Sequence, residues 1–186
     1  PFCWLAGDVR PKKILGLLAI EPNGPPFYNV AYGGHKQSHL KNSKTDQKRE
    51  GDKDWYITVS EPDRPGGITY LPLTFEPPLK ENESLIAEID SNSTKDSLVQ
   101  CYLQKEPARK LKNLQNLPIL ILSAEASYHS PYDHGTSNFL KQAGVEHDFI
   151  RLENHGLQGN GHMMMLENNN HQIADFLLKW MYSKIS

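Results

Sequence analysis

Gly159-Asn160-Gly161-His162-Met163-Met164-Met165 is the stretch around which the rest of the chain can be arranged. It places a histidine between turn-forming residues and an apolar run, shortly before a well-patterned terminal helix. A histidine in a loop at the end of a sheet can be exposed on one side and braced on the other, as a general base requires. The alternative is a turn histidine followed by methionines that fill a core. The remainder of the chain decides between these two interpretations.

Three segments of strand length predict a buried sheet. They cover Ile14 to Ile20, Ile119 to Leu122 and Val145 to Leu152. The first is a continuous apolar run, which is typical of a strand buried on both faces. It ends in the rigid turn Glu21-Pro22-Asn23-Gly24-Pro25-Pro26, so Glu21 lies at the carboxyl end of a strand. In open α/β sheets this is the edge where ligands bind and catalytic groups gather.

Helical periodicity accompanies these strands. Pro1 to Arg10 predicts a short helix whose face carries Phe2, Leu5, Ala6 and Val9. Ser130 to Ala143 predicts a second helix with Ser130 as its cap, and Ser97 to Leu114 is expected to be helical in part. One apolar face marks the closing helix: Ile173, Phe176, Leu177, Trp180, Met181 and Ile185. The order of elements predicts an α/β fold with three parallel strands and flanking helices.

Residues 28–114 form an insertion between the first two predicted strands. The tract from His35 to Asp54 carries charges of both signs, which indicates a solvated loop. Prolines and glycines then interrupt the apolar residues of Ile68 to Phe75. An irregular segment of this length inside a compact domain is uncommon unless it is a lid or disordered, and its apolar content favours a lid.

Length and composition indicate a single domain with a substantial core, because the 186 residues are 38% hydrophobic. The net charge of -2 and the pI near 6.5 come without a concentrated basic face, so no nucleic-acid partner is expected. No apolar run approaches the roughly 18 residues of a membrane-spanning helix. Pro1 is not an initiator methionine, and the first helix is already in progress there, so we expect this chain to be part of a longer protein.

Cysteines, sequons and histidines limit the remaining chemistry. Cys3 and Cys101 are too few for a disulfide framework, so free thiols are expected. Asn82-Glu83-Ser84 and Asn92-Ser93-Thr94 would suit a secreted protein, but such tripeptides also arise by chance and leave the compartment open. The histidines show no metal-ligand spacing with a carboxylate or cysteine, so neither a metal nor another cofactor is expected. The sequence does not indicate an oligomeric state.

Four segments of the chain resemble the esterase 713-like branch of the α/β-hydrolase superfamily. They are Glu21-Pro22-Asn23-Gly24, Leu71-Pro72-Leu73-Thr74, Ser123-Ala124-Glu125-Ala126-Ser127-Tyr128-His129 and the histidine stretch 159–165. The order of elements is similar to the C-terminal half of such a domain. The resemblance covers nearly the whole chain and implies that residues 1–186 are a partial α/β-hydrolase domain. Its implied activity is hydrolysis of a small-molecule carboxylic ester through an acyl-enzyme.

The resemblance also implies a catalytic triad in the chain order serine, acid, histidine, with the serine on a Gly-X-Ser-X-Gly elbow. The helix after the elbow corresponds to Pro1 to Arg10, and the sequence contains no Gly-X-Ser-X-Gly. The nucleophile is therefore expected a few residues before Pro1, and the fragment alone is expected to be inactive. His162 is the implied base.

Glu21 is the acid that the resemblance favours. Many α/β-hydrolases carry an aspartate after the strand that corresponds to Ile119 to Leu122, but the aligned position here is Ser127, which cannot stay ionised beside an imidazolium. The resembled branch has a glutamate at the position of Glu21. Glu125 and Asp133 are the rivals; we interpret Glu125 as a loop-shaping residue and Asp133 as a first-turn helix residue, where a negative charge is favourable without catalysis.

Several alternatives stay open. His129, His134 and His155 could approach the edge of the site, although a surface or packing role is favoured for each. The chain could also belong to a non-catalytic member of the fold or to an inactive truncated product. A hydrolase of lactones, thioesters or carbon–carbon bonds would use much the same machinery.

Overall fold

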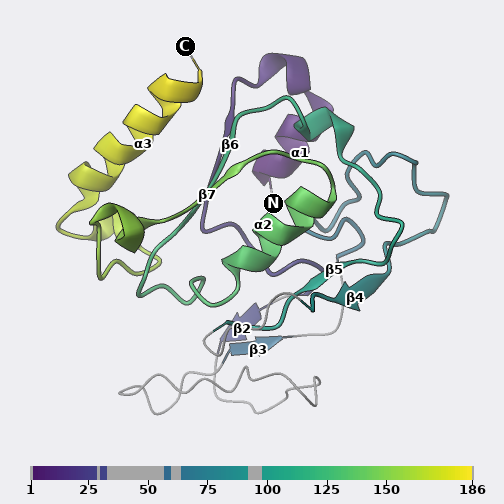
Figure 1. Cartoon of the computed structure of the whole chain (residues 1–186), viewed down its shortest axis with the longest axis horizontal. Helices are drawn as coiled ribbons and strands as arrows, with labels where there is room; N and C mark the ends of the chain where they lie inside the picture. The colour runs from purple at the N-terminus through teal and green to yellow at the C-terminus, as the bar shows by residue number, and fades with distance from the viewer. Residues whose placement is uncertain (1, 29, 33–56, 60–63, 92–97, 186) are drawn as a thin grey trace.

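Three parallel strands form the centre of the fold (Figure 1). The computed structural model describes residues 2–28, 30–32, 57–59, 64–91 and 98–185. The strands are β1 (Leu17–Ile20), β6 (Ile119–Ser123) and β7 (Asp148–Arg151), in the order β1-β6-β7. Both pairings are parallel, as the sequence predicted. The central strand, β6, is fully buried because a strand lies on each side of it and helices cover both of its faces.

The sheet separates two layers of helices, which the alternation of side chains along β6 makes possible. Ile119 and Ile121 belong to the core cluster that contains Trp4 of α1 (Phe2–Val9) and Phe139 of α2 (Asp133–Gln142). Leu120 and Leu122 belong to a second cluster with Ile173 and Trp180 of α3 (Asn170–Lys184). Figure 1 shows α3 on one side of the sheet and α1 and α2 on the other. The predicted flanking helices are therefore confirmed.

The first strand is shorter than predicted, because Pro118 limits its pairing with β6. The N–H of Leu17 donates to the carbonyl of Pro118 at 2.8 Å. Pro118 has no N–H of its own with which to extend the ladder toward Leu15, which is 74% exposed. The prediction that this strand is buried on both faces was also wrong, since Ile20 is 39% exposed.

The third strand is also shorter than predicted. Val145 and His147 precede β7, and Leu152 begins the short 3-10 helix η3 (Leu152–His155). The remaining 3-10 helices are η1 (Pro11–Lys13), η2 (Lys112–Leu114) and η4 (Met164–Leu166).

The first and second predicted helices are present, but both differ from the prediction in detail. α1 buries Trp4 and Gly7, while Phe2 and Val9, which were expected on its core face, are exposed. Gly7 explains the difference, because an added Cβ would lie 2.9 Å from Leu17 Cδ1, so this side of the helix sits directly on β1. α2 begins at Asp133 rather than at Ser130, and no side chain caps it.

Residues 98–114 are not helical beyond η2, which corrects the prediction for this segment. They contain β5 (Tyr102–Gln104), which pairs with β4 (Ala87–Ile89) in antiparallel fashion. Gln142 of α2 reinforces β5, because its side-chain oxygen accepts the Gln104 N–H at 2.9 Å and its amide donates to the Gln104 carbonyl at 2.8 Å. These partners are distant in sequence, so local periodicity could not reveal them.

The insertion contributes to the main core as well as to the surface. Ile68, Leu73 and Phe75 are buried in the same cluster as Trp4. A further antiparallel pair, β2 (Val30–Tyr32) and β3 (Ile57–Val59), lies below the three-stranded sheet in Figure 1, as do β4 and β5. The polar tract from 35 to 54 lies outside the described residues. A lid function for residues 28–114 stays a prediction.

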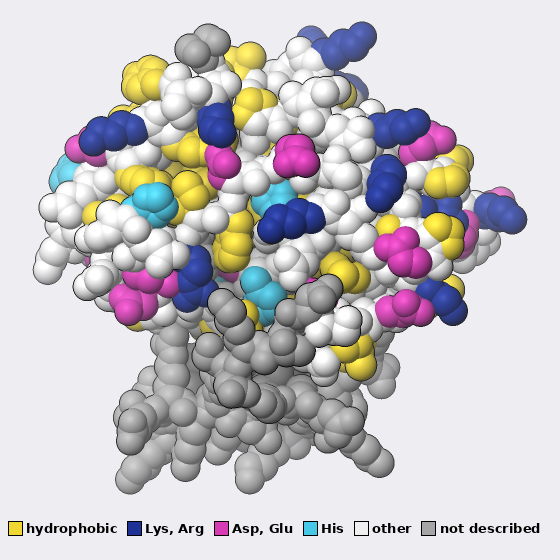
Figure 2. Space-filling model, viewed as in Figure 1, with side chains coloured by type: hydrophobic (Ala, Val, Ile, Leu, Met, Phe, Trp, Pro, Cys, Tyr) yellow, Lys and Arg dark blue, Asp and Glu magenta, His cyan; other side chains and the backbone are white. Residues whose placement is uncertain are grey.

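One face of the molecule carries charges of both signs (Figure 2). Lys and Arg side chains are interspersed with Asp and Glu on the face drawn in Figure 2. Among the described helices, none combines the length and the apolarity needed to cross a membrane. Cys3 and Cys101 are both free thiols, of which Cys101 is buried.

Replacing Gly67 tests how tightly the insertion packs against α2. Gly67 has φ +74°, and an added Cβ would lie 2.4 Å from Phe139 Cζ. Gly67→Ala should lower the free energy of unfolding by about 2–5 kcal/mol, because left-handed strain of roughly 1–2 kcal/mol adds to an overpacking cost of about 1–3 kcal/mol. Gly156→Ala is the matched control, since Gly156 has φ +79° but no atom within 4 Å of the added Cβ. Equal losses for the two variants in urea unfolding would contradict this packing.

Candidate active site

Glu21 directly follows β1 at the carboxyl edge of the sheet. Its N–H continues the parallel ladder by donating to the Leu122 carbonyl at 2.9 Å. Its backbone φ is +42°, a left-handed conformation that is uncommon for a residue other than glycine. Strain of this kind persists only where the surroundings enforce it, and it clusters at functional sites. The side chain is buried, with only 1% of its surface exposed.

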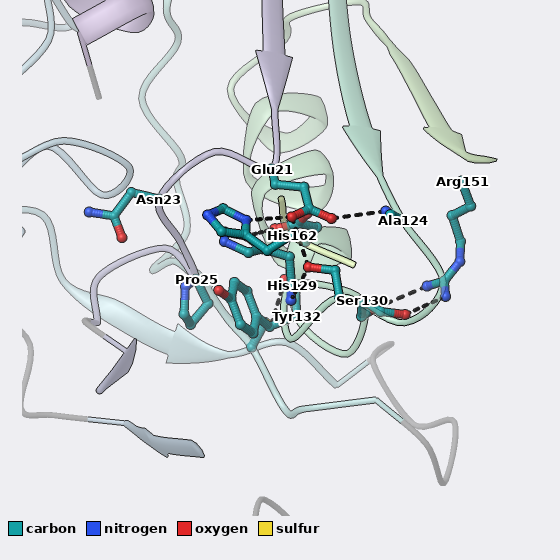
Figure 3. Close-up of polar contacts among 12 residues, drawn as sticks. Glu21, Asn23, Pro25, Ala124, His129, Ser130, Tyr132, Arg151 and His162 are labelled. Atoms are coloured by element: carbon teal, nitrogen blue, oxygen red, sulfur yellow. Dashed lines mark hydrogen bonds and ion pairs between the residues drawn. The ribbon is translucent and has the colours of Figure 1, made fainter. Parts of the chain in front are cut away.

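Three groups from two segments converge on the buried Glu21 carboxylate (Figure 3). The Ala124 N–H donates to Oε1 at 3.0 Å, and the Ser127 hydroxyl donates to Oε2 at 2.8 Å. Nδ1 of His162 lies 2.6 Å from the same Oε2. These contacts compensate for the burial of a negative charge, which would be costly without partners. The structure thus brings together the two residues that the sequence singled out.

The loop that carries His162 is held from both ends. The Ala126 N–H donates to the Asn160 carbonyl at 2.9 Å, and the Asn160 side chain is buried. That side chain exchanges hydrogen bonds of 2.6 and 2.9 Å with Asn169 and also donates to Glu167. Glu167 in turn accepts the Gly161 N–H at 2.8 Å. The residue immediately before His162 is therefore fixed by a carboxylate.

The methionines after His162 have divided roles. Met164 is buried in the cluster under α3, whereas Met163 and Met165 are exposed. The interpretation of the methionines as core residues therefore applies to one of the three. Met164 anchors the loop, while the His162 side chain remains 38% exposed. This combination of a braced loop and a partly open imidazole is what a general base requires.

Ser127 and Glu125 occupy supporting positions in the segment after β6. The Ser127 hydroxyl, at the position where an aspartate was considered, donates to Glu21 and accepts the His129 N–H at 3.1 Å. Glu125 is exposed and accepts the Gly159 N–H at 2.9 Å. Glu125 therefore contacts the backbone of the histidine loop, whereas the imidazole of His162 contacts Glu21.

His129 is a site residue that sequence reasoning underrated. Its ring stacks on that of His162, with 4.8 Å between centroids and 11° between planes (Figure 3). His129 is buried, and burial lowers the pKa of its imidazole to about 4. The Tyr128 ring lies 4.7 Å from the His162 ring and contacts His129 as well. The sequence feature that could have identified His129 is its position two residues after Ser127, in the loop where an acid was considered.

Asp133 lies behind His129 rather than beside His162. It is the first residue of α2 and is fully buried, with Oδ1 3.1 Å from Nδ1 of His129. Burial, and then the negative charge of Glu21, raise the pKa of the Asp133 carboxyl well above its usual range. Asp133, the alternative candidate for the acid, therefore contacts His129, whereas Glu21 contacts His162.

The other described histidines have different contacts or positions. His147 pairs with the Ser137 hydroxyl at 2.8 Å, and His155 packs on the ring of Phe176. His134 lies on α2 and His171 lies in the first turn of α3. His35 and His39 fall outside the described residues.

Arg64, from the insertion, holds the turn that follows Glu21. Its buried guanidinium donates to the Asn23 carbonyl at 3.1 Å and to the Asn23 side-chain oxygen at 3.0 Å. It also donates to the Pro25 carbonyl at 3.4 Å. Figure 3 shows Asn23 and Pro25 on the turn beside the histidines. Local sequence patterns could not predict this role, because the two segments are about 40 residues apart.

Three side chains of the site are enough in number to bind a metal ion: those of Glu21, His129 and His162. Their potential ligand atoms all lie within 4.8 Å of one another. The geometry favours a proton network instead. The 2.6 Å contact between Glu21 Oε2 and Nδ1 of His162 joins two of the three candidate ligands to each other by a hydrogen bond. The rings of His129 and His162 are nearly parallel, so their in-plane lone pairs do not converge on one point.

Comparison with known proteins gives one relative. The chain is 37% identical over 178 residues to the "Probable secreted lipase phiG" of Fungal sp. (strain ATCC 74256). The alignment covers 95% of this chain but only 42% of that protein, so the chain spans less than half the length of this relative. No family model matches the chain, and no solved structure matches it.

Removing the Glu167 carboxylate should loosen the histidine loop. In Glu167→Ala, the Gly161 amide should exchange with solvent at least about tenfold faster, because losing a partner of a buried polar group costs about 1–3 kcal/mol. Glu125→Ala is the matched control, since Glu125 accepts a backbone N–H of the same loop from an exposed position. Its effect should stay within about 0.5 kcal/mol. Equal acceleration of Gly161 exchange in the two variants, measured by NMR, would refute the bracing role.

Proposed function

We propose that this chain is part of a serine-dependent carboxylic ester hydrolase of the α/β-hydrolase fold, in the esterase 713-like branch. The observation that carries the proposal is the 2.6 Å contact between Nδ1 of the partly exposed His162 and the buried carboxylate of Glu21. The similarity to a protein described as a probable secreted lipase supports the same reaction class.

In this proposal the Glu21–His162 pair activates a serine. Glu21 holds Nδ1, which leaves Nε2 of His162 for the nucleophile. The serine oxygen attacks the ester carbonyl carbon while Nε2 takes its proton. When the carbon–oxygen bond to the alcohol breaks, Nε2 returns that proton to the leaving oxygen, and an acyl-serine remains. Water then repeats the sequence, releasing the acid and restoring the serine.

The proposal assigns the nucleophile and the oxyanion hole to residues that precede this chain in a longer protein. Among the described residues, neither a serine hydroxyl nor a cysteine thiol hydrogen-bonds to His162. The lipase relative is more than twice as long as the aligned region, which leaves room for both groups. The chain by itself is then inactive toward esters.

Residues 28–114 are proposed to cover the substrate site. Their β2–β3 and β4–β5 pairs lie on the side of the sheet toward which β6 points (Figure 1). Arg64 of this segment donates a hydrogen bond to the turn after Glu21. A small-molecule ester would then bind between this segment and the stacked histidines.

Glu21→Gln, made in the protein that includes the upstream segment, tests the acid. The amide cannot compensate the imidazolium, so kcat for a simple ester should fall by about 10³- to 10⁴-fold while the thermal unfolding temperature changes little. Glu125→Gln should retain near wild-type turnover, because Glu125 contacts only the loop backbone. Wild-type turnover in Glu21→Gln would remove Glu21 from the triad.

A fluorophosphonate probe tests the location of the nucleophile. The longer protein should be labelled on one serine upstream of Pro1, within a Gly-X-Ser-X-Gly sequence, and His162→Ala should abolish labelling because the base is lost. Peptide mass spectrometry identifies the modified residue. A replaced serine upstream, with no labelling, would instead support a non-catalytic binding protein of the same fold.

A further inference from the structure

A second histidine–carboxyl pair, His129 and Asp133, lies directly behind the Glu21–His162 pair. Its two members are one helical turn apart, and both are buried, with 3% and 0% of their surfaces exposed. The His129 ring connects the two pairs, because it contacts Asp133 through Nδ1 and stacks on His162 with its face. The proposed mechanism assigns no role to this buried, titratable pair.

The two carboxyl groups of this cluster have unequal support. Glu21 receives hydrogen bonds from a backbone N–H, a hydroxyl and an imidazole. Asp133 has one hydrogen-bond contact, to His129. Burial and the charge of Glu21 raise the pKa of Asp133 by more than the Ser123 hydroxyl and the charge of Arg151 lower it. The guanidinium of Arg151 is directed to Ser130 and Glu153. The negative charge of Glu21 disfavours ionisation of Asp133, and of two buried carboxyl groups that interact in this way the better-supported one keeps the charge.

We propose that Asp133 is a neutral carboxylic acid that donates its proton to Nδ1 of His129, and that His129 is thereby fixed as an uncharged platform on which His162 stacks. Both are positioning residues for His162, so the inference rests on the proposed function. The His129 ring then carries its remaining proton on Nε2. The low pKa of His129 and the raised pKa of Asp133 agree with a pair in which both members are neutral.

This arrangement balances the charges of the reaction. Glu21 supplies one negative charge for the one positive charge that forms on His162. A protonated His129, stacked at 4.8 Å, would repel that imidazolium, whereas an ionised Asp133 would stabilise it too strongly to release its proton to the leaving alcohol. The other titratable groups that face His129 are the phenols of Tyr128 and Tyr132, and the pKa of each is raised by burial, so both stay neutral.

Two substitutions of Asp133 separate a neutral acid from an ionised one. In the protein with its upstream segment, Asp133→Asn replaces one neutral donor by another, so kcat should stay within about threefold of wild type. The acidic limb of the kcat/KM profile should keep its midpoint. Asp133→Ala should lower kcat by about 10- to 100-fold with little change in KM. Loss of kcat in Asp133→Asn equal to that in Asp133→Ala, or a midpoint lowered by about one pH unit or more, would show an ionised Asp133 and overturn the proposal.

The platform role has its own matched pair of variants. His129→Phe keeps a planar, uncharged ring under His162 and should retain most of kcat, whereas His129→Ala should lose about 10- to 100-fold. Folding of each variant is checked by circular dichroism and thermal unfolding. If a folded His129→Phe protein is as slow as His129→Ala, stacking does not position His162.

An NMR measurement tests the pair without any turnover. In protein labelled with ¹⁵N-histidine, His129 should show one protonated nitrogen, Nε2, between about pH 5 and 8. An imidazolium signal at pH 7, or a proton on Nδ1, would overturn the proposal. This result is independent of ester hydrolysis: a wild-type protein without activity, or one unaffected by Glu21→Gln, would refute the proposed function while the NMR signals still report on the pair.

Discussion

The contact between the buried Glu21 carboxylate and Nδ1 of His162 is the interaction on which the rest of the site depends. It requires the parallel pairing of β1 with β6, because the bond from Glu21 N–H to the Leu122 carbonyl sets the carboxylate beside the Ala124 N–H. It also requires the loop brace at Asn160, which brings His162 to the same edge. The hydrogen bond between Glu21 and His162 therefore depends on both the register of the sheet and the anchoring of the histidine loop.

Burial imposes a strict charge balance on this cluster. Water does not reach the two buried carboxyl groups, so an ionised one needs donors of its own, and Glu21 has them while Asp133 has few. The left-handed backbone conformation of Glu21 costs free energy, and the same donors hold the residue in that conformation. The stacking of His129 on His162 further limits how the imidazole can turn. The electrostatics of the site and its geometry thus come from the same contacts.

The insertion supports the site as well as lying near it. Arg64 fixes the turn after Glu21, and Thr74 donates two hydrogen bonds of 2.9 Å to the buried Asp8 of α1. The rings of Phe27 and Phe139 pack edge to face beside Gly67. This contact joins the turn, the insertion and α2. A segment with these contacts cannot move as one rigid flap without disturbing the core.

The sequence by itself determined the elements that depend on local pattern. The apolar run of β6 was predicted nearly to the residue, because uninterrupted burial leaves a signal at every position. The face of α3 was predicted from the helical spacing of its apolar residues, of which Ile173 and Trp180 are buried. His162 and Glu21 were identified through motifs that surround them. The tertiary structure alone decided the start of β1, which is limited by Pro118, the residue before β6. It also decided the buried face of α1, which Gly7 sets by its close approach to β1. It alone also revealed Arg64 and the His129–Asp133 pair, because hydrogen bonds and ring stacking depend on distances between segments that sequence spacing does not encode.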